Sequence, residues 1–132
     1  MNNTATNSRD VGEQIYAAFA AGAVDDLLAR FRDDVVLDVP GDHPNAGRWE
    51  GRSGFVDFLA ASSAVATEDV EVVDLLAGDR HVAGYVVVRG ERAGRTPLVN
   101  HSVHLFELDD EGLVTSIRFH NADQPAVDAF WR

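Results

Sequence analysis

Residues 98–122, LVNHSVHLFELDDEGLVTSIRFHNA, are the stretch that decides the fold class. Polar and apolar side chains alternate over 98–108 and again over 113–122, and an acidic segment with a glycine separates the two. Alternation with a period of two predicts strands, and such a connecting segment predicts a turn. The same pattern holds upstream over 68–76 and 81–89, so the second half of the chain is predicted to be an antiparallel meander.

Apolar residues recur at helical spacing in the first half of the chain. Asp10 and Glu13 resemble a capping box, which predicts that a helix begins at Asp10 and ends near Gly22. A second helix is predicted from the stripe formed by Val24, Leu27, Leu28 and Phe31. A third helix is predicted behind Ser53, its expected N-cap, from the stripe formed by Phe55, Phe58, Leu59 and Ser62.

The remaining segments complete an α+β pattern. Residues 35–39 are predicted to be a strand, and the Pro- and Gly-rich segment 40–51 is predicted to be a loop with a short strand at 48–50. Residues 1–8 are expected to form a disordered leader, and residues 9–132 a single domain. Helices followed by a meander predict a curved antiparallel sheet packed on three N-terminal helices, an arrangement that leaves a conical pocket.

Composition excludes several classes of protein. The 132 residues are enough for one domain, and 22 acidic against 11 basic residues give a net charge of −11. That balance argues against nucleic acid or an anionic membrane surface as a partner. Because the chain has no cysteine and its histidines lack metal-binding spacing, neither a metal nor another cofactor is expected. No apolar run reaches a membrane-spanning length, so a cytoplasmic protein is expected.

Three segments carry a resemblance to a known family: AAFAAGAVDDLLARFRDDVVLDVPG (17–41), AGRWEGRSGFVDFL (46–59) and SVHLFELDDEGLVTSIRFHNAD (102–123). Nearly the whole chain, 9–131, resembles the SnoaL-like branch of the nuclear transport factor two-like superfamily, which includes ketosteroid isomerase and polyketide cyclases. The resemblance implies a cone-shaped, cystatin-like α+β barrel whose open end admits a small hydrophobic molecule. It also implies a homodimer through the outer face of the sheet. The strand predicted over 98–108 fits such a dimer, because it is apolar on both faces and needs cover on both.

The resemblance also points to candidate catalytic residues. The oxyanion-donor position of ketosteroid isomerase-like sites falls on His104, whose imidazole can donate or take up a proton near neutral pH. Asn121 falls near the pocket wall, where it can exchange hydrogen bonds but cannot act as a base. The base position falls on Val39, and Asp38 beside it is expected to face away from the pocket. Asp123 is expected to cap the terminal helical turn, so His104 and Asn121 are the predicted catalytic residues.

A wider set of side chains is predicted to contact the ligand. Asn100 and Ser102 share a strand face with His104, and unpaired polar groups on a buried face are costly unless the pocket is wet or filled. Tyr16 and Trp49 each combine an apolar body with a polar group that suits ligand contact. The predicted ligand-binding residues are Tyr16, Phe19, Val39, His43, Trp49, Phe58, Asn100, Ser102 and Phe119.

Three functions remain open at this point. The first is a cofactor-independent isomerase or cyclase that acts on a small hydrophobic molecule in the cone pocket, with His104 as proton carrier or oxyanion donor. The second is a non-catalytic small-molecule-binding domain of the same fold, which the valine at position 39 and the amide at position 121 favour. The third is a structural or dimerisation module, which a filled cone would favour.

Overall fold

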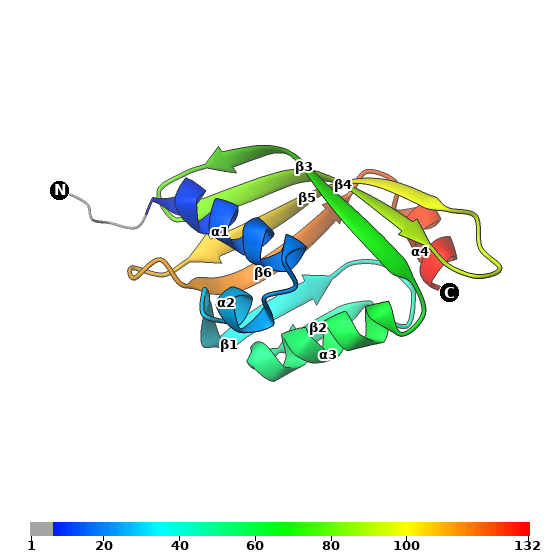
Figure 1. Ribbon diagram of the computed structural model, residues 1–132, viewed down its shortest axis with the longest axis horizontal. Coiled ribbons are helices and arrows are strands. Elements are labelled where there is room, and N and C mark those ends of the chain that lie inside the picture. Colours follow the sequence, from blue (N-terminus) through cyan, green and yellow to red (C-terminus); the bar gives the residue numbers. More distant parts are fainter. Residues whose placement is uncertain (1–6) are drawn as a thin grey trace.

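Four helices and six strands make up residues 7–132, the part of the chain that the computed structural model describes (Figure 1). The helices are α1 (Ser8–Ala20), α2 (Val24–Leu28), α3 (Gly51–Ser63) and α4 (Gln124–Trp131). The strands are β1 (Phe31–Val39), β2 (Gly47–Glu50), β3 (Thr67–Ala77), β4 (His81–Glu91), β5 (Leu98–Leu108) and β6 (Val114–Asn121). This order confirms the predicted α+β fold.

The six strands form one sheet in the order β2-β1-β6-β5-β4-β3. Neighbouring strands are antiparallel except β1 and β6, which run parallel, so the sheet is mixed and the expectation of a wholly antiparallel sheet is wrong at this one pair. A register shift interrupts β3 between Val72 and Asp74, and the long strands β3 and β4 curve across the molecule (Figure 1). Irregularities of this kind increase the local twist, which helps the sheet to curl around the helices.

The helices pack on the inner face of the sheet and form the main core with it. Val11 of α1, Leu27 of α2 and Phe55 of α3 meet sheet residues such as Val82 and Ile117, and all five side chains are buried. Burial of apolar side chains from every layer supplies the main driving force for this arrangement. The amphipathic periods of the sequence therefore correspond to the faces that the helices and strands bury.

A second, smaller core forms where α4 packs against β5. Val127, Phe130 and Trp131 contact Leu98, and all four side chains are buried. The Phe130 ring lies directly over Gly90 of β4, where an added Cβ would lie 2.9 Å from a ring carbon. The absence of a side chain at Gly90 therefore allows α4 to approach the sheet.

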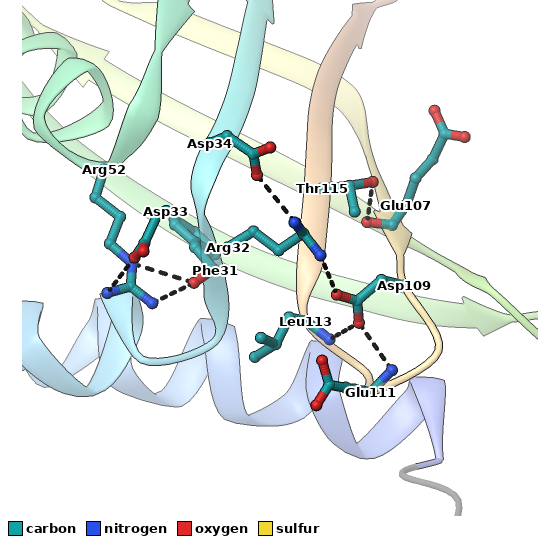
Figure 2. A network of polar contacts seen from close by, with 10 residues as sticks. All are labelled: Phe31, Arg32, Asp33, Asp34, Arg52, Glu107, Asp109, Glu111, Leu113 and Thr115. Carbon is teal, nitrogen blue, oxygen red and sulfur yellow. Dashed lines mark hydrogen bonds and ion pairs between the residues drawn. The ribbon is translucent and has the colours of Figure 1, made fainter.

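A network of polar contacts fixes the start of β1 (Figure 2). Arg52 of α3 donates two hydrogen bonds to the carbonyl oxygen of Phe31, at 3.1 and 2.6 Å, and forms an ion pair with Asp33. The Phe31 carbonyl precedes a register shift in the pairing of β1 with β6, so Arg52 satisfies an acceptor at an interruption of the ladder. Arg32 binds Asp109 of the β5–β6 turn at 3.1 Å, which ties β1 to that turn.

Several predicted boundaries shift for local reasons. α1 begins at Ser8 because Asn7, not Asp10, accepts the capping hydrogen bond from the backbone N–H of Arg9. Of the leader expected over 1–8, residues 1–6 lie outside the described residues. α2 ends at Leu28, and Phe31 is the first residue of β1 rather than the last position of the helical stripe. α3 begins at Gly51 with Glu50 as its N-cap, ahead of the expected cap at Ser53.

Candidate functional site

A cavity of about 480 Å³ lies between the inner face of the sheet and the helices. Its wall is mostly apolar, which suits a small hydrophobic molecule. Its polar lining residues are Tyr16, His43, Asn45, Ser62, Ser63, Glu68, Asn100, His104 and Asn121. A hollow of about 510 Å³ near residues 63–67 and 91–97 is more open to solvent and contains none of the predicted site residues, so the cone cavity is the candidate site.

His104 and Tyr16 form a hydrogen-bonded pair on the cavity wall. The Tyr16 hydroxyl lies 2.9 Å from Nδ1 of His104. Gly84 is the cross-strand partner of His104, and the Tyr16 ring lies over it so closely that an added Cβ would fall 2.7 Å from two ring carbons. Phe119 packs against the imidazole with 4.4 Å between ring centroids, and Phe106 meets the Tyr16 ring edge-on. The position of the pair is therefore set by α1, β4, β5 and β6 together.

Burial keeps both members of this pair uncharged. It lowers the pKa of His104 to about 4 and raises the pKa of Tyr16 above its usual range. His104 is partly exposed, but it lines the cavity and does not lie on the outer surface of the protein. Its imidazole ring is therefore largely desolvated. If Tyr16 donates to Nδ1, the neutral imidazole keeps a free Nε2–H; if Nδ1–H donates, the phenol O–H is free. Either tautomer leaves the pair with one hydrogen-bond donor to offer to a ligand.

Glu68 of β3 supplies a carboxyl group to the same cavity. Desolvation by its surroundings raises the pKa of Glu68 to about 6, although the residue as a whole stays exposed to solvent on one side. A carboxyl group with a pKa near 6 is mostly ionised at neutral pH, yet it holds a proton more readily than an ordinary glutamate. The sequence analysis did not identify Glu68, because nothing in the alternating pattern of β3 shows which of its faces the helices cover.

A chain of amide side chains runs from the cavity wall toward α4. Asn100 Nδ2 donates to Asn121 Oδ1 at 2.9 Å, and Asn121 Nδ2 donates to Gln124 Oε1 at 2.8 Å. Gln124 Nε2 in turn donates to the Asp128 carboxylate at 2.9 Å. Ser102 also donates to Asn121 Oδ1, at 2.8 Å. Asn121 is therefore held by hydrogen bonds on both sides and positions Asn100.

The structure places most of the predicted site residues on the cavity wall. Those that line it are Tyr16, Phe19, Val39, His43, Phe58, Asn100, His104, Phe119 and Asn121. Trp49 and Ser102 are not among the residues that line it. Trp49 donates its indole N–H to the Asn45 carbonyl and packs edge-on against Phe58, behind the wall. Ser102 is only 2% exposed, because its hydroxyl is turned toward Asn121 and β6.

The carboxylates near the ends of β1 and β6 do not line the cavity. Asp38 is in register with Arg48 on one side and Arg118 on the other, and it lies opposite to the buried Val39 face, as expected. Asp123 accepts a hydrogen bond from the backbone N–H of Ala126 and caps α4. At this end of β1 the cavity is therefore lined by Val39 and not by a carboxylate.

Two further searches bear on the site. Among residues 7–132, no group of three or more His, Asp or Glu side chains is arranged to hold a metal ion. Over the same residues, no helix has both the length and the apolar character needed to cross a membrane.

The chain belongs to the SnoaL-like domain family, whose model matches residues 13–117, and has the fold of the nuclear transport factor two-like superfamily. An uncharacterized protein of Mycobacterium tuberculosis is 30% identical over 125 residues, which cover 92% of this chain and 94% of that protein. The structure is also similar to Bal32a, from a soil-derived mobile gene cassette, with a TM-score of 0.90, 27% identity and coverage of 98% and 100% of the two chains. A Mycobacterium tuberculosis protein solved with estradiol-17beta-hemisuccinate shares the fold, with a TM-score of 0.73, 19% identity and coverage of 89% and 95%.

Proposed function

We propose that this protein is a cofactor-independent isomerase or cyclase that moves a proton on a small, largely apolar carbonyl compound bound in the cone cavity. The observation that carries the proposal is the Tyr16–His104 pair, a neutral hydrogen-bond donor on the wall of an apolar cavity that also contains a carboxyl group. The mycobacterial neighbour of the same fold that was solved with estradiol-17beta-hemisuccinate supports a small hydrophobic ligand.

In this mechanism the Tyr16–His104 pair donates a hydrogen bond to the carbonyl oxygen of the ligand. That bond stabilises the negative charge that develops on the oxygen when a proton leaves the adjacent carbon. In the tautomer whose Nδ1–H donates to Tyr16, the phenol O–H makes this bond and Nε2 of His104 takes up the proton. The C–H electron pair delocalises to the oxygen as an enolate, and the imidazolium of His104 returns the proton to another carbon of the enolate. No electron acceptor is needed, because the substrate and the product are isomers.

The uncharged state of His104 suits this role. At neutral pH the imidazole is uncharged and can take up a proton, while the phenol keeps the O–H that it donates to the enolate oxygen. Glu68 is in register with Gly90 and Leu98, six residues along β5 from His104, so it is not the base in this step. We expect the rate to stay level from about pH 8 to about 5 and to fall near pH 4, where His104 takes up a proton.

A suitable test is deuterium exchange at the acetyl methyl group of 4-acetylbiphenyl in D₂O, followed by NMR. We expect the protein to accelerate exchange, and we expect Tyr16→Phe and His104→Leu each to remove most of the acceleration. His120→Leu is the matched control, because His120 is also a strand histidine but does not line the cavity. Acceleration that survives in His104→Leu would exclude His104 as the base.

A second candidate function is a non-catalytic binding domain, and Val39 at the base position favours it. The same experiment separates the two candidates. If calorimetry shows that 4-acetylbiphenyl binds in the cavity but no exchange follows at any pH between about 5 and 8, the binding domain is the correct function.

We also propose a homodimer through the outer face of the sheet. Val99 is 59% exposed and Tyr85 is 38% exposed on this face, where Tyr85 pairs with Val103. Exposed apolar side chains grouped on one sheet face indicate a protein interface. Tyr85→Glu is expected to convert the dimer to a monomer in sedimentation equilibrium, whereas a monomeric wild-type protein at micromolar concentration would contradict the proposal.

A further inference from the structure

Two buried side-chain polar atoms among the described residues lack a hydrogen-bond partner, and both belong to residues of the cavity wall. They are Oδ1 of Asn100 and Nε2 of His43. Buried polar groups in folded proteins are nearly always paired, so an unpaired atom calls for an explanation. The location of both residues on one cavity wall indicates that a ligand supplies the missing partners.

The polarity of the Asn100 amide is fixed by the hydrogen-bonded chain behind it. Asp128 and the Pro40 carbonyl can only accept, so the Gln124 amide must turn its nitrogen toward them. Its oxygen then faces Asn121, whose nitrogen must donate to it, and the Asn121 oxygen must accept from Asn100. The Asn100 nitrogen is therefore used within the chain, and its oxygen is left as a free acceptor.

His43 lies at the end of the site to which this chain leads. Gln124 reaches the Pro40 carbonyl, three residues before His43, and His43 itself packs near Trp131 of α4. The backbone N–H of Asn45 donates to Nδ1 of His43 at 3.2 Å, so the hydrogen of the neutral ring is on Nε2. The α4 end of the cavity thus holds an unpaired acceptor on Asn100 and an unpaired donor on His43.

We propose that the α4 end of the cavity is a subsite for a hydroxyl group of the ligand. The ligand O–H donates to Oδ1 of Asn100, and the hydroxyl oxygen accepts from Nε2–H of His43. One hydroxyl group can satisfy both atoms, because it is at once a donor and an acceptor. Both atoms are shielded by their neighbours, so the side chains adjust on ligand entry, as side chains at binding sites commonly do.

This subsite rests on the proposed function and makes the substrate class more specific. Asn100 is four residues from His104 on the same face of β5, roughly 13 Å along an extended strand. The carbonyl group of the ligand lies at the Tyr16–His104 pair, and its hydroxyl group lies at the far end of an apolar body. The substrate class is therefore an apolar hydroxy-carbonyl compound with its two oxygens at opposite ends.

The test compares two ligands of almost the same shape, 4-acetyl-4′-hydroxybiphenyl and 4-acetyl-4′-methoxybiphenyl, by isothermal titration calorimetry. The methoxy compound keeps an oxygen but has no hydrogen to donate. We expect the wild-type protein to bind the hydroxy compound about tenfold more tightly, the ratio expected when one buried hydrogen bond is lost and an acceptor is left unpaired. Equal affinities in the wild-type protein would overturn the subsite.

Asn100→Leu is expected to bring the ratio to about one, since leucine has nearly the same size and no acceptor. Asn45→Leu is the matched control, because Asn45 also lines the cavity but its side chain is outside the amide chain. It should keep the tenfold ratio. A ratio that is unchanged in Asn100→Leu would overturn the assignment to Asn100, and the ratio within each variant is unaffected by a general loss of affinity.

The outcomes for the subsite and for the proposed function differ. If the wild-type protein binds both compounds equally and still accelerates exchange on 4-acetylbiphenyl, the subsite is wrong and the proposed function stands. If neither compound binds, the apolar ligand site itself is wrong, and the subsite is overturned with it. If Asn100→Leu does not fold, Gln124→Met takes its place, because it removes the group that fixes the orientation of the Asn121 and Asn100 amides. The ratio of affinities should then fall below tenfold, and an unchanged ratio would overturn the assignment to Asn100.

Discussion

Gly84→Ala should displace Tyr16 from His104, because the Tyr16 ring occupies the space that a side chain at position 84 would need. The added Cβ would lie 2.7 Å from Cε2 and Cζ of Tyr16 and closer still to its hydroxyl oxygen. Carbon atoms in ordinary contact are about 3.5–4.0 Å apart, so the ring must retreat by roughly 1 Å. A movement of that size breaks the hydrogen bond of 2.9 Å between Tyr16 and His104.

Three contributions set the expected change in the free energy of unfolding. Overpacking at a well-filled site costs about 1–3 kcal/mol. The lost hydrogen bond adds about 1 kcal/mol. Alanine restricts the unfolded chain more than glycine does, which returns about 0.4–1 kcal/mol. We therefore expect Gly84→Ala to lower the free energy of unfolding by about 1–3 kcal/mol.

Urea unfolding followed by circular dichroism measures this change. Gly78→Ala is the matched control, since the nearest atom to its added Cβ lies 3.9 Å away, and it should stay within about 0.5 kcal/mol of the wild type. In a Tyr16→Leu background the cost of Gly84→Ala should largely disappear, because the ring that it displaces is gone. The reasoning would be refuted if Gly84→Ala were as stable as the wild type, or if its cost were the same with leucine at position 16.

Three other predictions follow from the same contacts. Since the folded pKa of His104 is about 4 and its unfolded value is 6.5, the unfolded chain takes up the proton first as the pH falls. Between about pH 7 and pH 4.5 the wild type should therefore lose about 2 kcal/mol of stability relative to His104→Gln, as measured by urea unfolding of both proteins at each pH. Glu68, whose folded pKa is raised, adds the opposite slope between 4.5 and about 6, and this slope should remain in that variant. Arg52→Met should cost about 1–2 kcal/mol in urea, because the carbonyl at the start of β1 loses two donors, whereas Arg48→Met on the exposed β2 should cost less than about 0.5 kcal/mol. Ser102→Ala should cost about 1 kcal/mol of stability but leave the affinity for 4-acetylbiphenyl unchanged, since Ser102 does not line the cavity.

The sequence was sufficient to predict the architecture because each element buries one face. The period of two over β5 and the helical period over α1 specify the kind of element, and in α1 the period also specifies the buried side. Phe31 shows the limit of this reasoning. It continues the helical stripe of α2 at i+7, but an apolar residue at that position serves equally well as the first buried residue of a strand, and the Arg52 contact across the chain favours the strand.

Site residues could be predicted only on a strand for which the cavity-facing side had been assigned. His104 and Asn100 followed from the polar side chains on one face of β5 and from the family resemblance, and both line the cavity. Ser102 shares that face, but its short side chain bonds to Asn121 instead of reaching the cavity. Glu68 was missed because β3 is exposed along most of its length, so its pattern gives no inner face until α3 and α4 are placed.

The position of Glu68 separates the fold from the chemistry. In the sheet order β2-β1-β6-β5-β4-β3, β1 is near one edge and β3 is at the other. Asp38 on β1 lies opposite to the cavity face, while Glu68 is the carboxylate among the described residues that line the cavity. Glu68 is in register with Leu98, six residues along β5 from His104, so its carboxylate does not replace a base on β1. One architecture can therefore carry its charged groups at different points of the cavity wall, which is why the side chains of the site, and not the fold, must carry the functional argument.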